Sequence, residues 1–318
     1  MHIIITGGLG FIGSNITARL LNEGHQVTIL DNLATSIVTE IPGADVTNLD
    51  LTDDSAVADI KLSDADCLMH LARSSSGPES ANNPVGTVTH GYAQTYNALL
   101  LAKKSKVKRV LHASTMTVYG DIDPDINPVA EATPCLPVSN YGIGKFANER
   151  LVDIFCNSNG IGFNNLRMFN VYGNDANGPV AAHGLVGVFI DMLMKSPRAI
   201  SHGPLERFRD LVHVKDVVTA WVLCATNNNQ DGPFNVGSGQ SISFKGMITA
   251  IAEELGIACQ LTMEVGAGTP GDMFGAVADI SAIQAATGYT PEFSPVPGVK
   301  SFTRWAMETE LTKTPVGQ

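Results

Sequence analysis

The chain has 318 residues, of which 44% are hydrophobic, and a formal net charge of −11 at pH 7. This length can hold one large domain or two coupled domains with ample core, and the hydrophobic fraction is typical of a globular protein. The negative charge argues against nucleic acid and anionic membranes as partners, and no apolar run approaches the roughly 20 residues of a membrane span.

The cysteines are odd in number, widely scattered and without metal-like pairing: Cys67, Cys135, Cys156, Cys224 and Cys259. The chain also enters a strand pattern at once, with no basic leader or cleavage site. We therefore expect a cytoplasmic protein whose cysteines are reduced and mostly pack in the core, with no metal site.

Residues 3–30 read as a strand, a glycine-rich turn, a helix and a second strand. Gly7 allows the tight turn, Gly10 lets backbone N–H groups approach a pyrophosphate, and Gly13 lets helix and strand pack closely. The N-terminus of the helix points its free N–H groups and partial positive charge at the phosphates. A glycine cluster alone would indicate an ordinary turn, but with these flanks it predicts a dinucleotide site.

Asp31 ends the second strand. Its carboxylate can accept hydrogen bonds from both ribose hydroxyls of an adenosine, whereas a 2′-phosphate would meet a like charge. Asn32 offers no compensating positive charge, and no Arg or Lys follows until Lys61. We therefore expect NAD(H) rather than NADP(H); the alternative is that Asp31 only caps a turn.

Strands and helices continue to alternate, with strands over residues 44–46, 65–72 and 108–115 and a helix over 91–104. A third strand ends near Asp50 and Leu51, and Thr52 or Asp53 can cap the helix that follows. This alternation predicts a parallel sheet covered by helices on both faces, with the chemistry at the carboxyl ends of the strands.

Tyr141 and Lys145 are four residues apart, so on a helix they lie on one face, one turn from each other. Lys145 can then stabilise the tyrosinate electrostatically, which makes the phenol a usable general acid/base. An exposed structural pair has the same spacing. The dinucleotide pattern upstream and the hydroxyls of Ser114 and Thr115 at a strand end favour the catalytic interpretation.

These motifs and their order resemble the extended short-chain dehydrogenases/reductases, in the nucleotide-sugar epimerase/dehydratase branch that includes UDP-glucose and UDP-N-acetylglucosamine 4-epimerases. The resemblance covers nearly the whole chain. The residues that carry it are 6–13, 31–33, 50–53, 70–72, 114–115, 118–120, 141–145, 166–173, 209–216 and 234–239.

The resemblance implies an α/β fold, a Rossmann doubly wound parallel sheet with a smaller mixed C-terminal lobe. Residues 1–168 would form the NAD-binding domain, including the Tyr/Lys helix. Residues 169–318 would form the substrate-binding lobe, with some chain crossing back to the Rossmann sheet. Helical patterns over 185–194, 216–226 and 244–255 suit that smaller lobe.

The resemblance also assigns site residues by position. Tyr141 becomes the acid/base, Thr115 contacts the reacting sugar oxygen and relays its proton, and Lys145 binds the nicotinamide ribose. The implied NAD contacts are Gly7, Gly10, Phe11, Ile12, Gly13, Asp31, Asn32, Asp50, Leu51, Leu71, Ala72, Ser114, Tyr141 and Lys145. Asn170 and Arg209 would contact the substrate diphosphate, which needs a charge-assisted donor in so acidic a protein.

Four positions depart from the common family pattern. Met116-Thr117 replaces the acid that a dehydratase needs after the catalytic Thr, which disfavours 4,6-dehydration. Thr269 stands where a second diphosphate-binding Arg is usual, and Ala276 leaves room for an N-acetyl group on the sugar. Arg73 follows 70–72 where a small residue is usual, and we hypothesise that it replaces the missing cation at the diphosphate.

The leading hypothesis is an NAD-dependent epimerase of a nucleotide-diphospho sugar, acting at C4 through a transient 4-keto intermediate. One alternative is an NAD(P)H-dependent reductase of a 4-keto nucleotide sugar that uses the same residues. A second alternative is a non-catalytic NAD-binding protein, against which the presence of Thr115, Tyr141 and Lys145 argues.

In the family's usual dimer, helices 91–104 and 141–157 pair with their twofold mates as a four-helix bundle. Tyr92, Tyr96, Leu151 and Phe155 could supply the apolar face of that bundle, or they could face their own sheet. We expect a homodimer of this kind.

Overall fold

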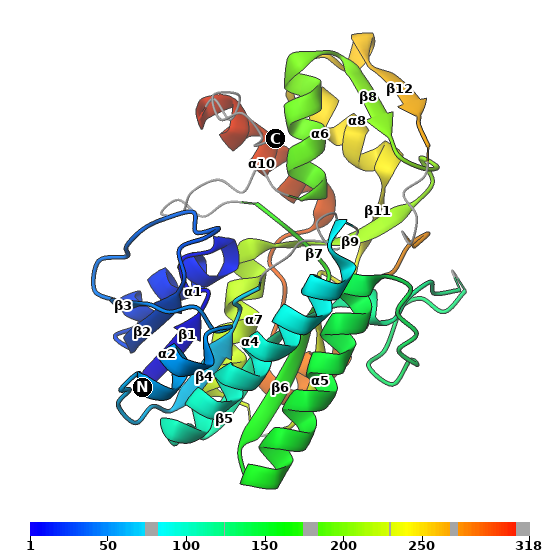
Figure 1. The fold of residues 1–318 in the computed structure, drawn as a ribbon. Helices are drawn as coiled ribbons and strands as arrows, with labels where there is room; N and C mark the ends of the chain where they lie inside the picture. The colour runs from blue at the N-terminus through cyan, green and yellow to red at the C-terminus, as the bar shows by residue number, and fades with distance from the viewer. Residues whose placement is uncertain (74–81, 124, 174–183, 229, 268–272, 310–318) are drawn as a thin grey trace.

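The computed structural model describes residues 1–73, 82–123, 125–173, 184–228, 230–267 and 273–309 (Figure 1). Its main feature is a parallel seven-stranded sheet in the order β10-β6-β5-β4-β1-β2-β3. The strands are β1 (His2–Thr6), β2 (Gln26–Asp31), β3 (Asp45–Asn48), β4 (Cys67–His70), β5 (Arg109–Thr115), β6 (Gly162–Met168) and β10 (Gly232–Val236). The chain order reverses between β1 and β4, so the sheet is doubly wound and the predicted Rossmann fold is confirmed.

Helices cover both faces of the large sheet, because alternate residues of each strand point to opposite faces. On one face lie α1 (Phe11–Asn22), α7 (Val214–Thr226) and α9 (Ser281–Thr287); on the other lie α2 (Asp54–Asp59), α4 (Pro84–Lys104) and α5 (Asn140–Asn159). Ile3 and Ile5 of β1 share a buried core with Trp221 of α7, whereas Ile4 shares the opposite core with Leu99 of α4.

A smaller lobe is built on two short sheets, seen above the large sheet in Figure 1. The strands β7 (Asn170–Tyr172), β9 (Phe208–His213) and β11 (Ser241–Ser243) form one sheet, and β8 (Arg198–Ser201) pairs with β12 (Thr262–Val265). Its helices are α6 (Leu185–Lys195), α8 (Phe244–Glu254) and α10 (Pro295–Thr309). They enclose a separate core that includes Phe189, Met247 and Phe302.

Helix α7 is the main departure from the predicted arrangement. The sequence pattern places residues 216–226 in the smaller lobe, but Val217, Ala220 and Trp221 are buried against the large sheet. The strand that follows, β10, also returns to the large sheet and pairs with β6. The division into an NAD-binding part before residue 169 and a substrate-binding part after it stays a prediction.

Helix α4 begins earlier than the sequence pattern indicates. It starts at Pro84 in place of residue 91, because the Asn83 side chain accepts a hydrogen bond from the Gly86 N–H and proline is favoured in a first turn. Leu99 is fully buried, while Tyr92 and Tyr96 are 49% and 42% exposed.

Helix α5 carries the other two residues of the predicted apolar face. Leu151 and Phe155 are partly buried and pack against the core between α5 and the large sheet. They therefore face their own sheet, unlike the two exposed tyrosines of α4.

The five cysteines are free thiols, and Cys67, Cys156 and Cys224 are buried. In the part of the chain that the structure describes, no helix is both long and apolar enough to cross a membrane. Over the same residues, no group of three or more His, Cys, Asp and Glu side chains is arranged to hold a metal ion.

Candidate active site

The glycine-rich turn between β1 and α1 is shaped by close backbone contacts. Gly7 has a φ of +71°, and a Cβ at this position would lie 2.6 Å from the backbone nitrogen of Ala72. A Cβ on Gly13 would lie 2.3 Å from the carbonyl oxygen of Gly7. At Gly10 the nearest atom would be 3.4 Å away. Glycine is therefore required at 7 and 13 by contacts within the fold, whereas the surroundings of Gly10 are more open.

The first turn of α1 can receive an anion. Gly10 caps this helix without a side-chain hydrogen bond, and the first turn contains no acidic residue. Phe11 and Ile12 follow it and are partly exposed. The N–H groups of a first turn have no partner within the helix and carry partial positive charge, which suits a phosphate.

Asp31 lies beside this turn at the end of β2. Its Oδ2 accepts a hydrogen bond from the Leu9 N–H at 3.0 Å, and its Oδ1 accepts from the Leu33 N–H at 3.0 Å and the Ser36 hydroxyl at 2.8 Å. The carboxylate is 7% exposed. It therefore places a nearly buried negative charge at the edge of the glycine-rich turn.

Two further predicted cofactor contacts meet next to Asp31. The Asn32 amide donates to the Asp50 carboxylate at 3.3 Å. Hydrogen bonds from the backbone and hydroxyl of Thr52 lower the pKa of Asp50. Leu51 is buried against the core under α4. Asn32 and Asp50 are exposed, which leaves them accessible to a ligand.

The residues after β4 are hydrogen-bonded to Thr6 at the end of β1. The Leu71 N–H donates to the Thr6 carbonyl at 3.0 Å, and the Ala72 N–H donates to the Thr6 hydroxyl at 3.3 Å. The same hydroxyl bonds to Nδ1 of His70 at 2.7 Å. Leu71 and Ala72 thus lie directly beside Gly7, at the point where the strand order reverses.

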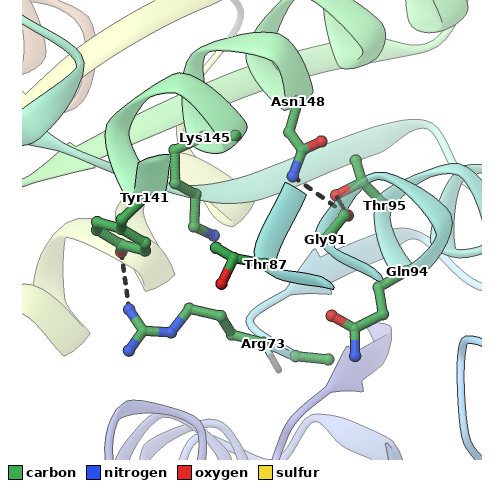
Figure 2. Close-up of a pocket in the computed structure, with 10 residues that line it drawn as sticks. Arg73, Thr87, Gly91, Gln94, Thr95, Tyr141, Lys145 and Asn148 are labelled. Carbon is green, nitrogen blue, oxygen red and sulfur yellow. Dashed lines mark hydrogen bonds between the residues drawn. The ribbon is translucent and has the colours of Figure 1, made fainter. Parts of the chain in front are cut away.

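Tyr141 lies in the first turn of α5, and its phenol contacts Arg73 from across the sheet edge (Figure 2). Nη1 of Arg73 donates to Oη of Tyr141 at 2.8 Å, and the guanidinium carbon lies 4.8 Å from the ring centre. Tyr141 is partly buried and Arg73 is exposed. The cation in contact with the phenolic oxygen is therefore Arg73.

Lys145 lines the same pocket one helical turn later, as the four-residue spacing predicts. Its ammonium is buried and donates to the carbonyl oxygen of Ala113 in β5 at 2.6 Å. Burial, followed by the positive charge of Arg73, lowers the pKa of Lys145 to about 7, while Glu149 acts in the opposite direction.

Thr115 ends β5 and caps the 3-10 turn η1 (Met116–Val118). Its hydroxyl oxygen accepts from the backbone N–H and the hydroxyl of Thr117, each at 3.3 Å. A Cβ on Gly142 would lie 2.7 Å from the Thr117 carbonyl oxygen, so α5 packs tightly on this turn. This packing brings the start of the Tyr141 helix against the strand end that carries Thr115.

Ser114 takes part in a buried charged network beneath the pocket. Its hydroxyl donates to the carboxylate of Glu149, which forms an ion pair with Arg167 at 2.7 Å. Arg167 also donates to the Tyr119 hydroxyl at 3.1 Å. Glu149 was not among the predicted site residues, although it follows Lys145 by four residues on the buried face of α5. A buried glutamate at such a position needs a partner.

The pocket around Tyr141 and Lys145 has a second wall that the sequence reasoning missed (Figure 2). It consists of residues of α4 and α5: Thr87, Gly91, Gln94, Thr95 and Asn148. Among the described residues, Oε1 of Gln94 and Oδ1 of Asn148 are buried and have no hydrogen-bond partner. A buried acceptor without a protein partner is suited to accept a hydrogen bond from a ligand or a water molecule. Residues 87, 91, 94 and 95 share one helix face, and the three polar side chains among them were a signal from which a pocket wall could have been predicted.

The two predicted diphosphate contacts lie in the smaller lobe. Asn170 starts β7, and its Oδ1 is buried without a hydrogen-bond partner in the part of the chain described. The Arg209 guanidinium donates to the backbone carbonyls of Phe208, Met273 and Phe274 and stacks over Phe244. Contact of Asn170 and Arg209 with the substrate diphosphate stays a prediction.

Of the other positions that depart from the family pattern, the structure describes Met116 and Ala276. Ala276 is fully buried and packs with Met273 in the core near η1. Thr269 lies outside the described residues. Met116 is buried, so its side chain contributes packing rather than an acid at this strand end.

Comparison with known proteins identifies the family. Residues 3–237 match the model of the NAD dependent epimerase/dehydratase family. The chain belongs to this family. It is an NAD-dependent nucleotide-sugar epimerase of the extended short-chain dehydrogenase/reductase type, as the sequence motifs predict.

Relatives within the family match over most of the chain. A UDP-glucose 4-epimerase of Mycolicibacterium smegmatis is 31% identical over 268 residues, which cover 80% of this chain and 83% of that protein. A UDP-glucose 4-epimerase of Halalkalibacterium halodurans is 27% identical over 313 residues, 92% of this chain and 91% of that protein.

Solved epimerase structures share the fold. The UDP-glucose 4-epimerase of Thermotoga maritima, solved with UDP-glucose, is 26% identical with a TM-score of 0.89, covering 98% of this chain and 100% of that one. The UDP-glucose 4-epimerase of Thermus thermophilus, solved with NAD, is 28% identical with a TM-score of 0.82, covering 96% and 98%. NAD as the cofactor is thereby confirmed for this family member, while the roles of individual residues remain predictions.

Proposed function

We propose that this protein interconverts the C4 epimers of a UDP-sugar, with tightly held NAD. One observation carries the proposal. Ala72 packs against Gly7 of the dinucleotide turn, and the next residue, Arg73, reaches the Tyr141 phenol. The cofactor cradle and the acid/base are therefore adjacent at the point where the strand order reverses, where ligands bind in this class of sheet.

The residues present fit an NAD molecule. The accessible first turn of α1 suits its pyrophosphate, and the buried carboxylate of Asp31 suits the adenosine ribose. Lys145 and Gln94 line the pocket in which the other ribose would lie, and Oε1 of Gln94 is buried without a hydrogen-bond partner over the described residues. When bound, NAD supplies a hydride acceptor that later returns the hydride to the same carbon.

The chain's own groups would move the proton. The Tyr141 phenolate takes the proton of the C4 hydroxyl, with Thr115 as the hydroxyl that contacts the sugar oxygen. The 4-keto sugar would then turn over in the pocket and present its other face to the cofactor, and Tyr141 would return the proton to the C4 oxygen. Lys145 would bind the nicotinamide ribose. The hydrogen bond from its ammonium to the Ala113 carbonyl fixes the lysine side chain against β5.

The diphosphate would lie between the large sheet and the smaller lobe. Asn170 supports this placement because its side-chain oxygen is buried and unpaired over the described residues. Arg209 and Arg73 are the cations proposed for this role from the sequence. Arg209 is 4% exposed and fixed by backbone carbonyls, so it offers a positioned charge rather than a mobile one.

We also propose that the protein is a cytoplasmic homodimer. The exposed tyrosines of α4, Tyr92 and Tyr96, lie with Leu100 along a groove of about 580 Å³ between α4 and α2. The adjoining helix α5 exposes Ile143 and Ile154. These apolar side chains support a four-helix bundle formed by α4 and α5 of two copies, and the five free thiols suit a reducing compartment.

The proposal is tested by incubating the purified protein with a panel of UDP-, dTDP-, CDP- and GDP-sugars without added cofactor. We expect a UDP-sugar to reach equilibrium with its C4 epimer, as measured by NMR of the products. Steady consumption of added NADH with a sugar product would instead identify a reductase.

Tyr141→Phe is the decisive variant for the acid/base. It should fold and bind NAD but lose about 10²- to 10⁴-fold in kcat, because general acid/base catalysis contributes about that much. Ser158→Ala, which removes an exposed hydroxyl near the other end of α5, is the matched control and should keep its turnover. Retained activity in Tyr141→Phe would contradict the assigned role.

A further inference from the structure

Arg73 holds a place that neither the dinucleotide turn nor the Tyr–Lys spacing accounts for. It follows Ala72 at the end of β4, and its side chain runs across the pocket to the first turn of α5 (Figure 2). There it donates a hydrogen bond to Tyr141 Oη at 2.8 Å. An arginine is always charged in proteins. This contact therefore places a permanent positive charge at hydrogen-bond distance from the phenolic oxygen of Tyr141.

We propose that Arg73 is a positioning residue of the epimerase, whose fixed charge holds Tyr141 as the phenolate that removes the proton of the sugar hydroxyl. The proposal rests on the proposed function of Tyr141. It replaces the sequence-based hypothesis that Arg73 binds the substrate diphosphate. A positive charge at hydrogen-bond distance favours the ionised form of an acid over its neutral form.

Lys145 cannot supply this constant charge. Its ammonium donates to the Ala113 carbonyl. Burial and the charge of Arg73 lower the pKa of Lys145 to about 7, so near neutral pH it is only partly protonated. The charge of Lys145 therefore changes across the working range of pH, while that of Arg73 does not.

The other elements around the pocket add little charge near the phenol. The wall from α4 is uncharged, with Thr87, Gln94 and Thr95. The end of β5 contributes the Ala113 carbonyl, which accepts from Lys145, and the uncharged hydroxyls of Ser114 and Thr115.

The ionisable groups deeper in the pocket are compensated or neutral. Glu149 of α5 is paired with Arg167. His70 and His112 stack beneath Lys145, and burial lowers the pKa of His70 to about 3 and that of His112 well below its ordinary value, so both are neutral at working pH. Arg73 is thus the unvarying charge that acts on Tyr141 Oη among the described residues.

The test compares pH profiles of kcat in the NAD-loaded enzyme with saturating UDP-sugar. Arg73→Gln keeps a hydrogen-bond donor but removes the charge, and Arg73→Lys keeps the charge. Arg198→Gln is the control: it also removes one exposed arginine, in an ion pair with Glu264 of the smaller lobe. Arg73 is exposed, so its variants should fold, which melting temperatures can check.

In Arg73→Gln, we expect the acid limb of log kcat to move up by about one pH unit, which is about a tenfold loss of kcat on that limb and recovery at alkaline pH. Arg73→Lys should recover most of the shift, and Arg198→Gln should match the unmodified enzyme. An unmoved acid limb would overturn the proposal. A rise in KM with an unchanged profile would also overturn it, and would return Arg73 to the diphosphate.

A second readout does not depend on turnover. The ultraviolet absorbance of tyrosinate, taken as the difference between each protein and its Tyr141→Phe counterpart, titrates Tyr141 alone. We expect Tyr141 to ionise at higher pH in Arg73→Gln than in the unmodified NAD-loaded protein, and equal titrations would overturn the proposal. If no sugar nucleotide is epimerised, the proposed function fails, and this titration still decides the role of Arg73.

Discussion

At the scale of single residues, the cofactor cradle is determined by contacts of a few ångströms. A side chain on Gly7 or Gly13 would collide with backbone atoms of Ala72 or of the turn itself. Asp31 ties the turn to β2 by accepting from Leu9 and Leu33 on its two oxygens. Its carboxylate is held rigidly and nearly buried, which limits screening of its charge by solvent.

This rigid charge predicts cofactor selectivity. NAD(H) should bind about ten- to a hundredfold more tightly than NADP(H), because the 2′-phosphate would be placed against Asp31 in a poorly screened site. Asp31→Asn removes the repulsion but keeps an acceptor, so the ratio of dissociation constants should fall toward one. Calorimetry with both cofactors measures the ratio, and tighter binding of NADP(H) by the unmodified protein would refute the assignment.

The sequence was sufficient for residues whose signal is local. The glycine spacing, Asp31 at a strand end, and Tyr141 with Lys145 one turn apart are all patterns within a few residues. Arg73 shows the limit, because its partner Tyr141 is 68 positions away and is brought near only when α5 packs on β5 and β6, next to β4 in the sheet. A buried acceptor without a partner, such as Oε1 of Gln94, likewise can be recognised only from the packing of the neighbouring helices.

At the scale of elements, adjacent strands are joined by buried imidazoles. His70 of β4 and His112 of β5 are paired in register and stack with their ring centres 5.8 Å apart. His70 also bonds Thr6 of β1 and Thr95 of α4, so it links two strands and a helix. Burial, with a smaller contribution from the charge of Lys145, lowers the pKa of His70 to about 3.

This burial makes the fold sensitive to acid. Between about pH 6.5 and 3 the unfolded chain protonates residue 70 while the native state keeps it neutral, so stability falls as pH falls through that window. From pH 7 to 5, the free energy of unfolding should fall by about 2 kcal/mol more in the unmodified protein than in His70→Gln. Urea unfolding at both pH values measures this. Equal losses in the two proteins would show that residue 70 does not contribute.

Element positions were predictable where local chemistry marks a boundary. Asp53 was expected as a possible cap, and its side chain does cap α2. The side that a helix covers was less predictable. Helix α7 was expected in the smaller lobe, yet its apolar face, including Trp221, fits the large sheet. An amphipathic pattern states that a face is buried but does not specify which sheet buries it.

At the scale of the whole molecule, an acidic protein presents an apolar stripe along α4 and α5. Tyr92 and Tyr96 are 49% and 42% exposed, and Ile154 of α5 is 62% exposed. Contiguous exposed apolar patches on a globular protein mark interaction sites. A twofold pairing of these helices would cover the stripe with a second copy of itself.

If α4 and α5 of two copies pair in this way, a charged residue introduced into the interface should separate the two copies. Tyr96→Glu should convert the dimer to a monomer in light scattering at micromolar concentration, because two carboxylates would be desolvated near the twofold axis. Val188→Glu, on the exposed side of α6, changes charge equally and should leave the dimer intact. A Tyr96→Glu protein that stays dimeric would place the interface elsewhere, and a monomeric unmodified protein would exclude a dimer.

Epimerisation at C4 requires oxidation and reduction of one sugar carbon, with the proton transferred by Tyr141 and the hydride never released to solvent. The most direct measurement uses a UDP-sugar carrying deuterium at C4, incubated in ordinary water without added NAD. We predict that the C4 epimer forms with its deuterium fully retained at C4, as shown by NMR and mass spectrometry. Loss of the deuterium to solvent during epimerisation would contradict the account.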